Sequence, residues 1–265
     1  MTTVAEALSA DDLEAALRLA TEGVKAKPAD TAARLLLIDV LVLSGDYERA
    51  DRQADALAKL APKDAVQLAI LRGQIRGMDA RAQWFGEGAV PSFPGGPTQA
   101  DEAALRLAVA LREGDGDAAR TASDAIEAAR EPITLAWNSV SAPDFRDADD
   151  RLPHALEVIS TGGVYLWIDF SRLAKLALQP IHRPRDLAFR RAELTLKSGS
   201  VAEVLVPAIY GGAGNGAAHL LGRETGWAEL PGGLVAGRGQ RCFLVGEELQ
   251  PLSDTETLQA EAGDA

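Results

Sequence analysis

The residue types that most often do chemistry are thinly spread through this sequence. Its three histidines, His154, His182 and His219, lack the mutual spacing of metal ligands, and its single cysteine, Cys242, lies in a run typical of a buried strand. Zinc sites need clustered nitrogen and sulfur donors. We therefore predict no metal site and no cofactor, and we interpret the histidines as surface or hydrogen-bonded residues.

Two other arrangements resemble catalytic motifs without completing them. The glycine-rich stretch 211–216 follows an expected strand, but a phosphate-binding loop would continue with Gly-Lys-Ser/Thr at a helix start, and Ala-Ala-His follows here. Glu193 and Glu203 lie on neighbouring expected strands, yet paired carboxylates need a cleft and perturbed pKa values for acid–base work. We interpret the glycine-rich stretch as a surface turn and the two glutamates as exposed strand carboxylates. We therefore predict that the protein is not an enzyme.

Positive charge gathers in one short segment of an otherwise acidic chain. The net charge is −12, and residues 1–150 contribute most of it, with 26 acidic and 16 basic side chains. Such a chain repels the phosphates of nucleic acids, so we predict no nucleic-acid partner. Six basic residues nevertheless fall within twenty positions that contain one acid, Asp186; they are Arg172, Lys175, Arg183, Arg185, Arg190 and Arg191. This segment could dock the acidic helical part or an acidic partner, or it could be a solvated face.

An internal repeat organises the N-terminal part. The sequence Asp-Leu-Glu-Ala-Ala at 12–16 recurs 34 residues later as Asp-Tyr-Glu-Arg-Ala at 46–50, and Pro28 aligns with Pro62. This period is that of the tetratricopeptide repeat, a helix–turn–helix unit that stacks into a grooved scaffold. We predict a first helix capped by Ser9, then helices at 31–43, 46–60 and from 64 onward. Helices at 98–113 and 116–130 could form a third, degenerate repeat.

The sequence changes character after Pro132. Alternating and β-branched runs predict strands at 155–159, 164–168, 187–196, 201–209 and 241–245. We therefore predict a multidomain α and α+β fold. Residues 1–140 form tetratricopeptide-like helical hairpins, interrupted by a Pro/Gly-rich loop at 86–98, and residues 147–265 form a mostly antiparallel α+β domain. The sequence also lacks a signal-like start and a run of about 18 apolar residues, so we expect a cytoplasmic protein without a membrane contact.

A series of short motifs runs through the C-terminal half. It begins with Asp-Ala-Asp-Asp-Arg-Leu at 147–152 and Leu-Glu-Val-Ile at 156–159. It continues through 163–173, 185–187, 192–199, 221–227, 239–241 and 243–248. These motifs resemble the conserved domain of the ImpE family, also called TagJ. Two departures are Gly226, where the family often has an acidic residue, and the glycine-rich loop at 211–219. Several separate motifs in the same order make the resemblance specific.

The resemblance implies an accessory component of the bacterial type VI secretion system, a contractile injection machine. It implies a non-enzymatic adaptor that binds the N-terminal helix of the small sheath subunit and is linked with the AAA+ ATPase that disassembles the sheath. A tetratricopeptide-like groove captures such segments through apolar anchors with a polar rim. The predicted contacts, on helices 31–43, 64–76 and 101–112, are Arg34, Ile38, Leu41, Arg72 and Arg106. The competing interpretation of their apolar members is the core between hairpins.

A second contact surface is also predicted, and alternative functions stay open. The surface would consist of Arg172, Arg183, Arg223, Glu224 and Trp227. Alternatively, Arg223 and Glu224 form an internal salt bridge and Trp227 anchors the C-terminal fold. One alternative function is an enzyme whose cleft gathers Asp169, Arg172, His182 and Arg223. Another is a self-assembling scaffold with a large apolar interface between copies.

Overall fold

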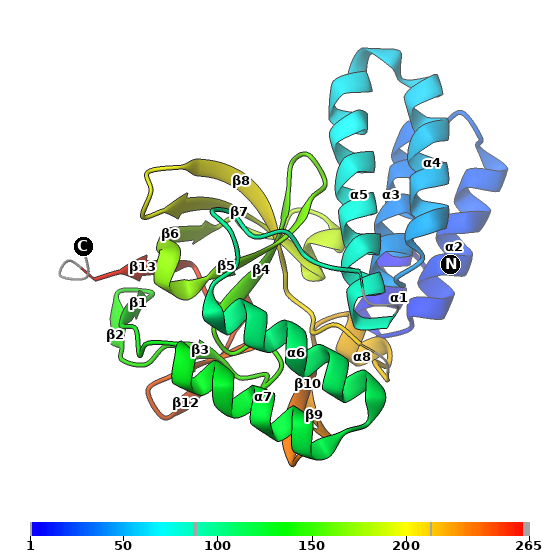
Figure 1. Ribbon diagram of the computed structural model, residues 1–265. Coiled ribbons are helices and arrows are strands. Elements are labelled where there is room, and N and C mark those ends of the chain that lie inside the picture. The colour runs from blue at the N-terminus through cyan, green and yellow to red at the C-terminus, as the bar shows by residue number, and fades with distance from the viewer. Residues whose placement is uncertain (1, 87–88, 213, 262–265) are drawn as a thin grey trace.

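The fold was analysed in a computed structural model that describes residues 2–86, 89–212 and 214–261. Residues 87–88 of the expected loop, residue 213 of the glycine-rich stretch and the ends of both expected domains, residues 1 and 262–265, lie outside these ranges. Figure 1 shows an upright bundle of helices beside a β-rich region, with two further helices crossing below the larger sheet. The predicted fold class, helical hairpins followed by a mostly antiparallel α+β region, is confirmed.

The bundle contains the two predicted hairpins. Its helices are α1 (Val4–Ser9), α2 (Leu13–Ala26), α3 (Thr31–Leu43), α4 (Tyr47–Leu60) and α5 (Ala65–Gly86), with the 3-10 turn η1 (Pro62–Asp64) before α5. Aspartates at positions 12, 30 and 46 cap α2, α3 and α4 by accepting backbone N–H bonds. The prediction that Ser9 caps the first repeat helix is wrong, because Ser9 ends α1 and the Asp12 carboxylate satisfies Ala15 N–H at 2.8 Å.

Small side chains let the bundle helices approach closely. Ala16, Ala50 and Ala54 are fully buried, and Ala20 is nearly so. These are the positions at which the 34-residue repeat places alanine, so the repeat in the sequence corresponds to a repeat in the packing. The result is a regular stack of antiparallel helices.

A third helical hairpin forms, but it lies apart from the stack. Helices α6 (Gln99–Glu113) and α7 (Gly116–Ala129) pack against the β-rich region instead of continuing the row of α2–α5 (Figure 1). The Thr98 hydroxyl, at the start of α6, donates to the Asp169 carboxylate at 2.9 Å. On α7, the Arg120 guanidinium donates to the carbonyl of Gly232 at 3.0 Å. This hairpin therefore belongs structurally with the C-terminal half.

The β-rich region is built from three antiparallel sheets. The larger one has the order β2-β1-β13-β6-β7-β8-β4-β5, and the smaller ones pair β9 with β10 and β11 with β3 and β12. The strands are β1 (Leu135–Trp137), β2 (Val140–Ala142), β3 (Arg146–Asp147), β4 (Ala155–Ser160), β5 (Tyr165–Asp169), β6 (Leu173–Leu178), β7 (Phe189–Leu196), β8 (Val201–Pro207), β9 (Thr225–Leu230), β10 (Leu234–Gly239), β11 (Cys242–Val245), β12 (Glu248–Pro251) and β13 (Thr257–Ala260). Short turns η2 (Phe170–Arg172), η3 (Pro184–Leu187) and η4 (Leu252–Asp254) and helix α8 (Ala217–Leu220) complete the chain.

Several strands were not predicted, and long-range pairing explains why. β1 lies within residues 1–140, which were expected to be helical, and it pairs with β13 from the other end of the chain. A three-residue strand carries little local signal of its own, because its stability comes from its neighbours.

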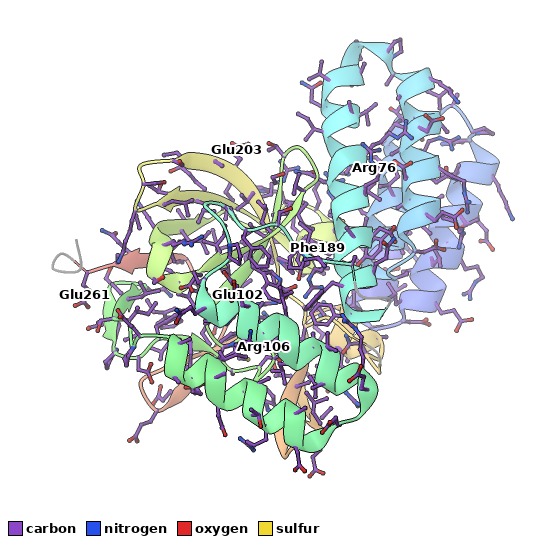
Figure 2. The ribbon with its side chains drawn as sticks, in the orientation of Figure 1. Arg76, Glu102, Arg106, Phe189, Glu203 and Glu261 are labelled. Carbon is purple, nitrogen blue, oxygen red and sulfur yellow. The ribbon has the colours of Figure 1, made fainter. Side chains whose placement is uncertain are left out.

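The helical bundle and the larger sheet meet at a close backbone contact, which we call the junction. Here α5 lies against the turn between β4 and β5, and glycines on both sides make room. A Cβ atom added to Gly163, whose φ is +84°, would lie 2.1 Å from the carbonyl oxygen of Gly73. A Cβ on Gly77 would lie 2.6 Å from Ile159 Cγ2. Only glycine permits backbones this close. Figure 2 shows Phe189 between the sheet and the bundle, and the centroid of its ring lies 6.4 Å from that of Tyr47 of α4 in an edge-on arrangement.

A buried ionic network fixes the junction. Arg81 of α5 forms two bonds with the Glu157 carboxylate of β4, at 2.8 and 2.9 Å, and Glu157 also pairs with Arg241. Arg241 in turn binds Asp147 at 2.7 Å. Burial alone would raise the pKa of Glu157, but Arg81 and Arg241 more than offset burial and lower it to about 2. The carboxylate is therefore ionised, and the network joins the bundle to the sheet as one packed unit.

Candidate partner-binding groove

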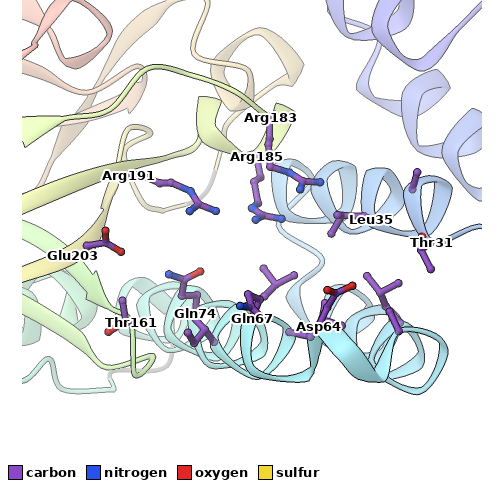
Figure 3. Close-up of a pocket in the computed structure, with 16 residues that line it drawn as sticks. Thr31, Leu35, Asp64, Gln67, Gln74, Thr161, Arg183, Arg185, Arg191 and Glu203 are labelled. Carbon is purple, nitrogen blue, oxygen red and sulfur yellow. The ribbon is translucent and has the colours of Figure 1, made fainter.

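An open groove lies beside the junction, between the bundle and the sheet. Its volume is about 610 Å³. Figure 3 shows α5 forming one side of the groove, with α3 and the arginines of the η3 segment opposite it and β7 toward the sheet end. The apolar floor consists of Leu35, Leu57, Leu68, Ile70 and Leu71. An open, partly apolar concavity with charged walls is the usual form of a binding site.

Two arginines on the η3 side share one buried carboxylate. Asp39 of α3 is 1% exposed, and its two oxygens accept bonds from Arg183 at 3.0 Å and from Arg185 at 2.8 Å. Burial raises the pKa of Asp39, and the two guanidiniums partly offset that shift. Burial likewise lowers the pKa of Arg185. One carboxylate facing two guanidiniums leaves an excess of positive charge at this wall.

Residues of two neighbouring strands continue the wall. Arg191 of β7 is exposed, and Figure 3 shows its guanidinium directed into the groove from the sheet side. Glu203 of β8 lies further along, and it occupies the cross-strand position opposite Glu193. Both glutamates are exposed, as predicted for strand carboxylates. The wall thus carries Arg183, Arg185 and Arg191 against the carboxylates of Asp39 and Glu203.

Exposed apolar side chains extend the floor along the bundle. Ile70 is 40% exposed on α5, Val66 is 69% exposed one turn earlier, and Leu60 at the end of α4 is 44% exposed. Apolar side chains at successive turns of one helix, next to a concave floor, offer surface that a partner could remove from water.

Two of the predicted contact residues lie in the core, so they cannot contact a partner in this fold. Ile38 and Leu41 are both 0% exposed, enclosed by the neighbouring helices. The run from Leu37 to Leu43 is buried all round, so α3 has an open face only in its first turns, at Thr31, Ala32 and Leu35. The competing interpretation, the core between hairpins, holds for this part of α3.

The three predicted arginine contacts do not line the groove. Arg34 donates to Gln53 at 2.5 Å and to the carbonyl of Pro28 at 2.9 Å. Arg72 binds Asp51 and Asp55 of α4, at 2.8 and 2.6 Å, and so ties α5 to α4. Arg106 is exposed on α6, in the separate hairpin (Figure 2). The structure therefore does not bring these arginines together.

The second predicted surface is also divided. Among its members, Arg183 alone lines the groove. Arg172 donates to the carbonyls of Pro94 and Gly96 and anchors the loop before α6. Arg223 and Glu224 do not form the alternative salt bridge with each other, because Arg223 pairs with Asp11 at 3.3 Å and Glu224 faces His219 at 3.5 Å. Trp227 is 41% exposed beside Tyr210.

One group of side chains in the described part of the chain could hold a cation. Asp101, His154 and Asp169 are all buried, and one potential ligand atom of each lies within 4.8 Å of the others. This cluster was not predicted from the sequence, because its three residues lie far apart in the chain. Several of their polar atoms have protein partners: His154 Nε2 lies 3.0 Å from Asp101, and Asp169 accepts bonds from Thr98 and Ser171, whereas His154 Nδ1 is buried without a hydrogen-bond partner. This bonding already serves to dock α6 on the sheet.

The residues of the alternative enzyme cleft are not gathered in one cavity. Asp169 lines a small cavity of about 260 Å³ under α6, whereas Arg172, His182 and Arg223 do not line it. His182 is exposed, and its backbone N–H donates to Asp186.

Sequence reasoning identified only part of the groove. Asp39 is a single acid within an apolar helix, a pattern that signals a buried partner but does not identify it. The basic segment supplied Arg183, Arg185 and Arg191, yet their position opposite α3 and α5 follows only from the three-dimensional arrangement.

Stacked helical hairpins joined to an antiparallel sheet, with an open groove between them, define a protein built on a repeat scaffold. The tetratricopeptide repeat model matches residues 7–75, and the ImpE protein model matches residues 139–259. The type VI secretion system accessory component TagJ of Pseudomonas aeruginosa PAO1 is 31% identical, over 98% of this chain and 92% of its own length. The crystal structure of protein VPA1032 from Vibrio parahaemolyticus matches with a TM-score of 0.92 and 29% identity, covering 98% of both chains.

The chain therefore belongs to the ImpE/TagJ family, and the resemblance found in its sequence is confirmed. In the described part of the chain, no helix combines the length and the apolar character needed to cross a membrane.

Proposed function

We propose that this protein is a non-enzymatic adaptor of the bacterial type VI secretion system that binds the N-terminal segment of the small sheath subunit. Its relative in Pseudomonas aeruginosa is an accessory component of that system. The observation that carries the proposal is the open groove of about 610 Å³ between a tetratricopeptide-like bundle and a basic wall. Grooves of this kind hold partner segments through apolar anchors and charged rims.

The chemistry of the described side chains supports an adaptor in preference to an enzyme. The most strongly perturbed carboxylates, Glu157 and Asp147, are fully enclosed in the ionic network of the junction. Their partners are guanidiniums and tyrosine hydroxyls of the protein itself. Perturbed groups that open onto a cavity suggest catalysis, whereas enclosed and mutually paired groups indicate a structural role.

The proposal includes a link to the AAA+ ATPase that disassembles the sheath, in the cytoplasm where both partners would act. A second partner needs a surface apart from the groove. Arg223, Glu224 and Trp227 are exposed at the start of β9 and do not line the groove, so they are the surface we assign to such a contact. Exposed tryptophan and arginine side chains are enriched where proteins bind one another.

The test is isothermal titration of the protein with the small sheath subunit of the same secretion system. The intact subunit and a version without its N-terminal segment are compared. We expect saturable binding of the intact subunit and loss of binding after the truncation. Absence of binding, or binding that the truncation leaves unchanged, would contradict the proposed function.

A further inference from the structure

We infer that the groove accepts one amphipathic helix that places its apolar side chains on α3 and α5 and its carboxylates against Arg183 and Arg191. This inference rests on the proposed function, because the helix is taken to be the N-terminal segment of the sheath subunit. It adds where that segment lies and which of its side chains are recognised.

The floor of the groove has the length and shape of a helix-binding surface. On this side its lining extends from Asp64, the last residue of η1, to Gln74 of α5. At 1.5 Å per residue, this stretch measures about 15 Å, or about three helical turns. A helix laid along it would meet Ile70 and Leu71 from one side and Leu35 of α3 from the other. Helix-in-groove recognition uses anchors at spacings of three and four residues, which a floor of this length can hold.

The charges of the groove favour carboxylates on one flank of that helix. Arg183 and Arg185 share the single carboxylate of Asp39, so their wall keeps excess positive charge. Arg191 adds an exposed guanidinium beside them, and none of the hydrogen bonds and ion pairs found among the described residues engages it. This wall stands out on a chain whose net charge is −12. Guanidiniums bind carboxylates in a planar, two-point geometry, which gives orientation as well as affinity.

Each end of the groove carries a carboxylate, and this sets the register of a bound helix. Asp64, the residue before α5, lies at the end of the groove away from Glu203 (Figure 3). Glu203 lies at the sheet end. A bound helix therefore places its acidic flank against the middle of the groove, where Arg183 and Arg191 face α3, and keeps acids away from Asp64. Charge matching of this kind selects partners and fixes their register.

The test measures the affinity of a fluorescently labelled synthetic N-terminal segment of the sheath subunit by anisotropy. Two groove variants, Arg191→Glu and Ile70→Arg, are matched by two controls away from the groove, Arg18→Glu on α2 and Val109→Arg on α6. All four positions are solvent-exposed, so the variants are expected to fold. We expect each groove variant to weaken binding roughly tenfold or more. We expect each control to change binding by less than about twofold. The effect of Arg191→Glu should shrink at high salt, because screening weakens exposed charge pairs.

The possible results separate the inference from the proposed function. Wild-type binding that neither groove variant weakens would overturn the inference and leave the adaptor role standing. No binding of the segment to the wild-type protein would overturn the inference, and titration with the whole subunit would then decide the adaptor role separately. Self-association of the wild-type protein in sedimentation experiments, lost in Ile70→Arg, would identify a second copy of the chain as the occupant and would also overturn the inference.

Discussion

Helix α5 meets the sheet in two different ways along its length. Side chains of its first half, as far as Gln74, line an open groove. Gly73, Gly77 and Arg81 lie on a closed face, packed against β4 and the turn that follows it. Charge is used differently in the two regions. In the junction each guanidinium is enclosed and paired, whereas in the groove two guanidiniums share one carboxylate and Arg191 is exposed. One interface can therefore hold the bundle and the sheet together and still leave an open surface beside the contact.

The largest expected effect comes from breaking the ionic network of the junction. Glu157→Gln would leave Arg81 and Arg241 buried without their shared counter-charge. We expect a loss of about 3 to 5 kcal/mol in the free energy of unfolding near neutral pH. The measurement is urea denaturation of wild type and variant.

The same variant should show a defined pH dependence. The pKa of Glu157 is lowered from 4.5 to about 2 in the folded protein. Its stabilisation is therefore complete above about pH 4.5 and is lost as the pH falls toward about 2, so the gap between wild type and variant should narrow across that window. A matched control is Glu48→Gln, which removes an exposed ion pair with Arg52. We expect it to change stability by less than about 0.5 kcal/mol. A gap that stays constant across the pH window would contradict the assignment.

A smaller loss is expected from a methyl group placed in the backbone contact. Gly163→Ala combines a positive φ with a clash against Gly73, and we expect a cost of about 2 to 3 kcal/mol. Gly199→Ala is the control, since Gly199 has a φ of +86° and an added Cβ would meet nothing within 4 Å. It isolates the backbone strain of about 1 kcal/mol. Equal losses in the two variants, measured by thermal unfolding, would show that close approach at the junction contributes nothing.

A still smaller effect should distinguish a clamp inside the bundle from a partner contact. Arg72 lies between Asp51 and Asp55, and hydrogen bonding to Arg72 is the main cause of the lowered pKa of Asp51. We expect Arg72→Ala to cost about 1 kcal/mol in unfolding free energy. We also expect it to leave the affinity for the sheath segment unchanged. A variant of unaltered stability but weakened binding would instead make Arg72 a direct contact.

The smallest expected effect on stability belongs to the groove itself. Arg191→Glu changes an exposed side chain of β7 that is absent from the ionic network of the junction. We expect its unfolding free energy to stay within about 0.5 kcal/mol of wild type. A large loss in denaturant unfolding would mean that Arg191 supports the fold, and the contrast between groove and junction would fail.

The helices were predicted well because their signals are local. The bounds of α3 agree with the predicted 31–43. Helices α4 and α6 each begin one residue after the predicted start, because the first residue of each predicted range is the N-cap. Caps, periodicity and breakers all act within a few residues of the chain. The family resemblance also came from contiguous motifs, so it too could be recognised from the sequence.

The site could be predicted only in part, because its residues meet across long distances in the chain. Asp39 and Arg185 lie 146 positions apart and are joined by one ion pair. The periodicity of α3 shows that Ile38 and Leu41 share a face, but it cannot show which helix covers that face. From the sequence alone, Gly73 and Gly77 would be expected only to lower the stability of a helix. In the fold they are the places where the turn between β4 and β5 approaches.

The most direct test of the central claim is amide hydrogen exchange of the protein with and without the N-terminal segment of the sheath subunit. Binding in the groove should slow exchange in residues 31–35, 64–74 and 183–191. The junction, already closed, should exchange slowly in both samples, and α6 and α7 should not change. Slowed exchange confined to α6 and α7 or to the start of β9, with no change along 64–74, would contradict the account.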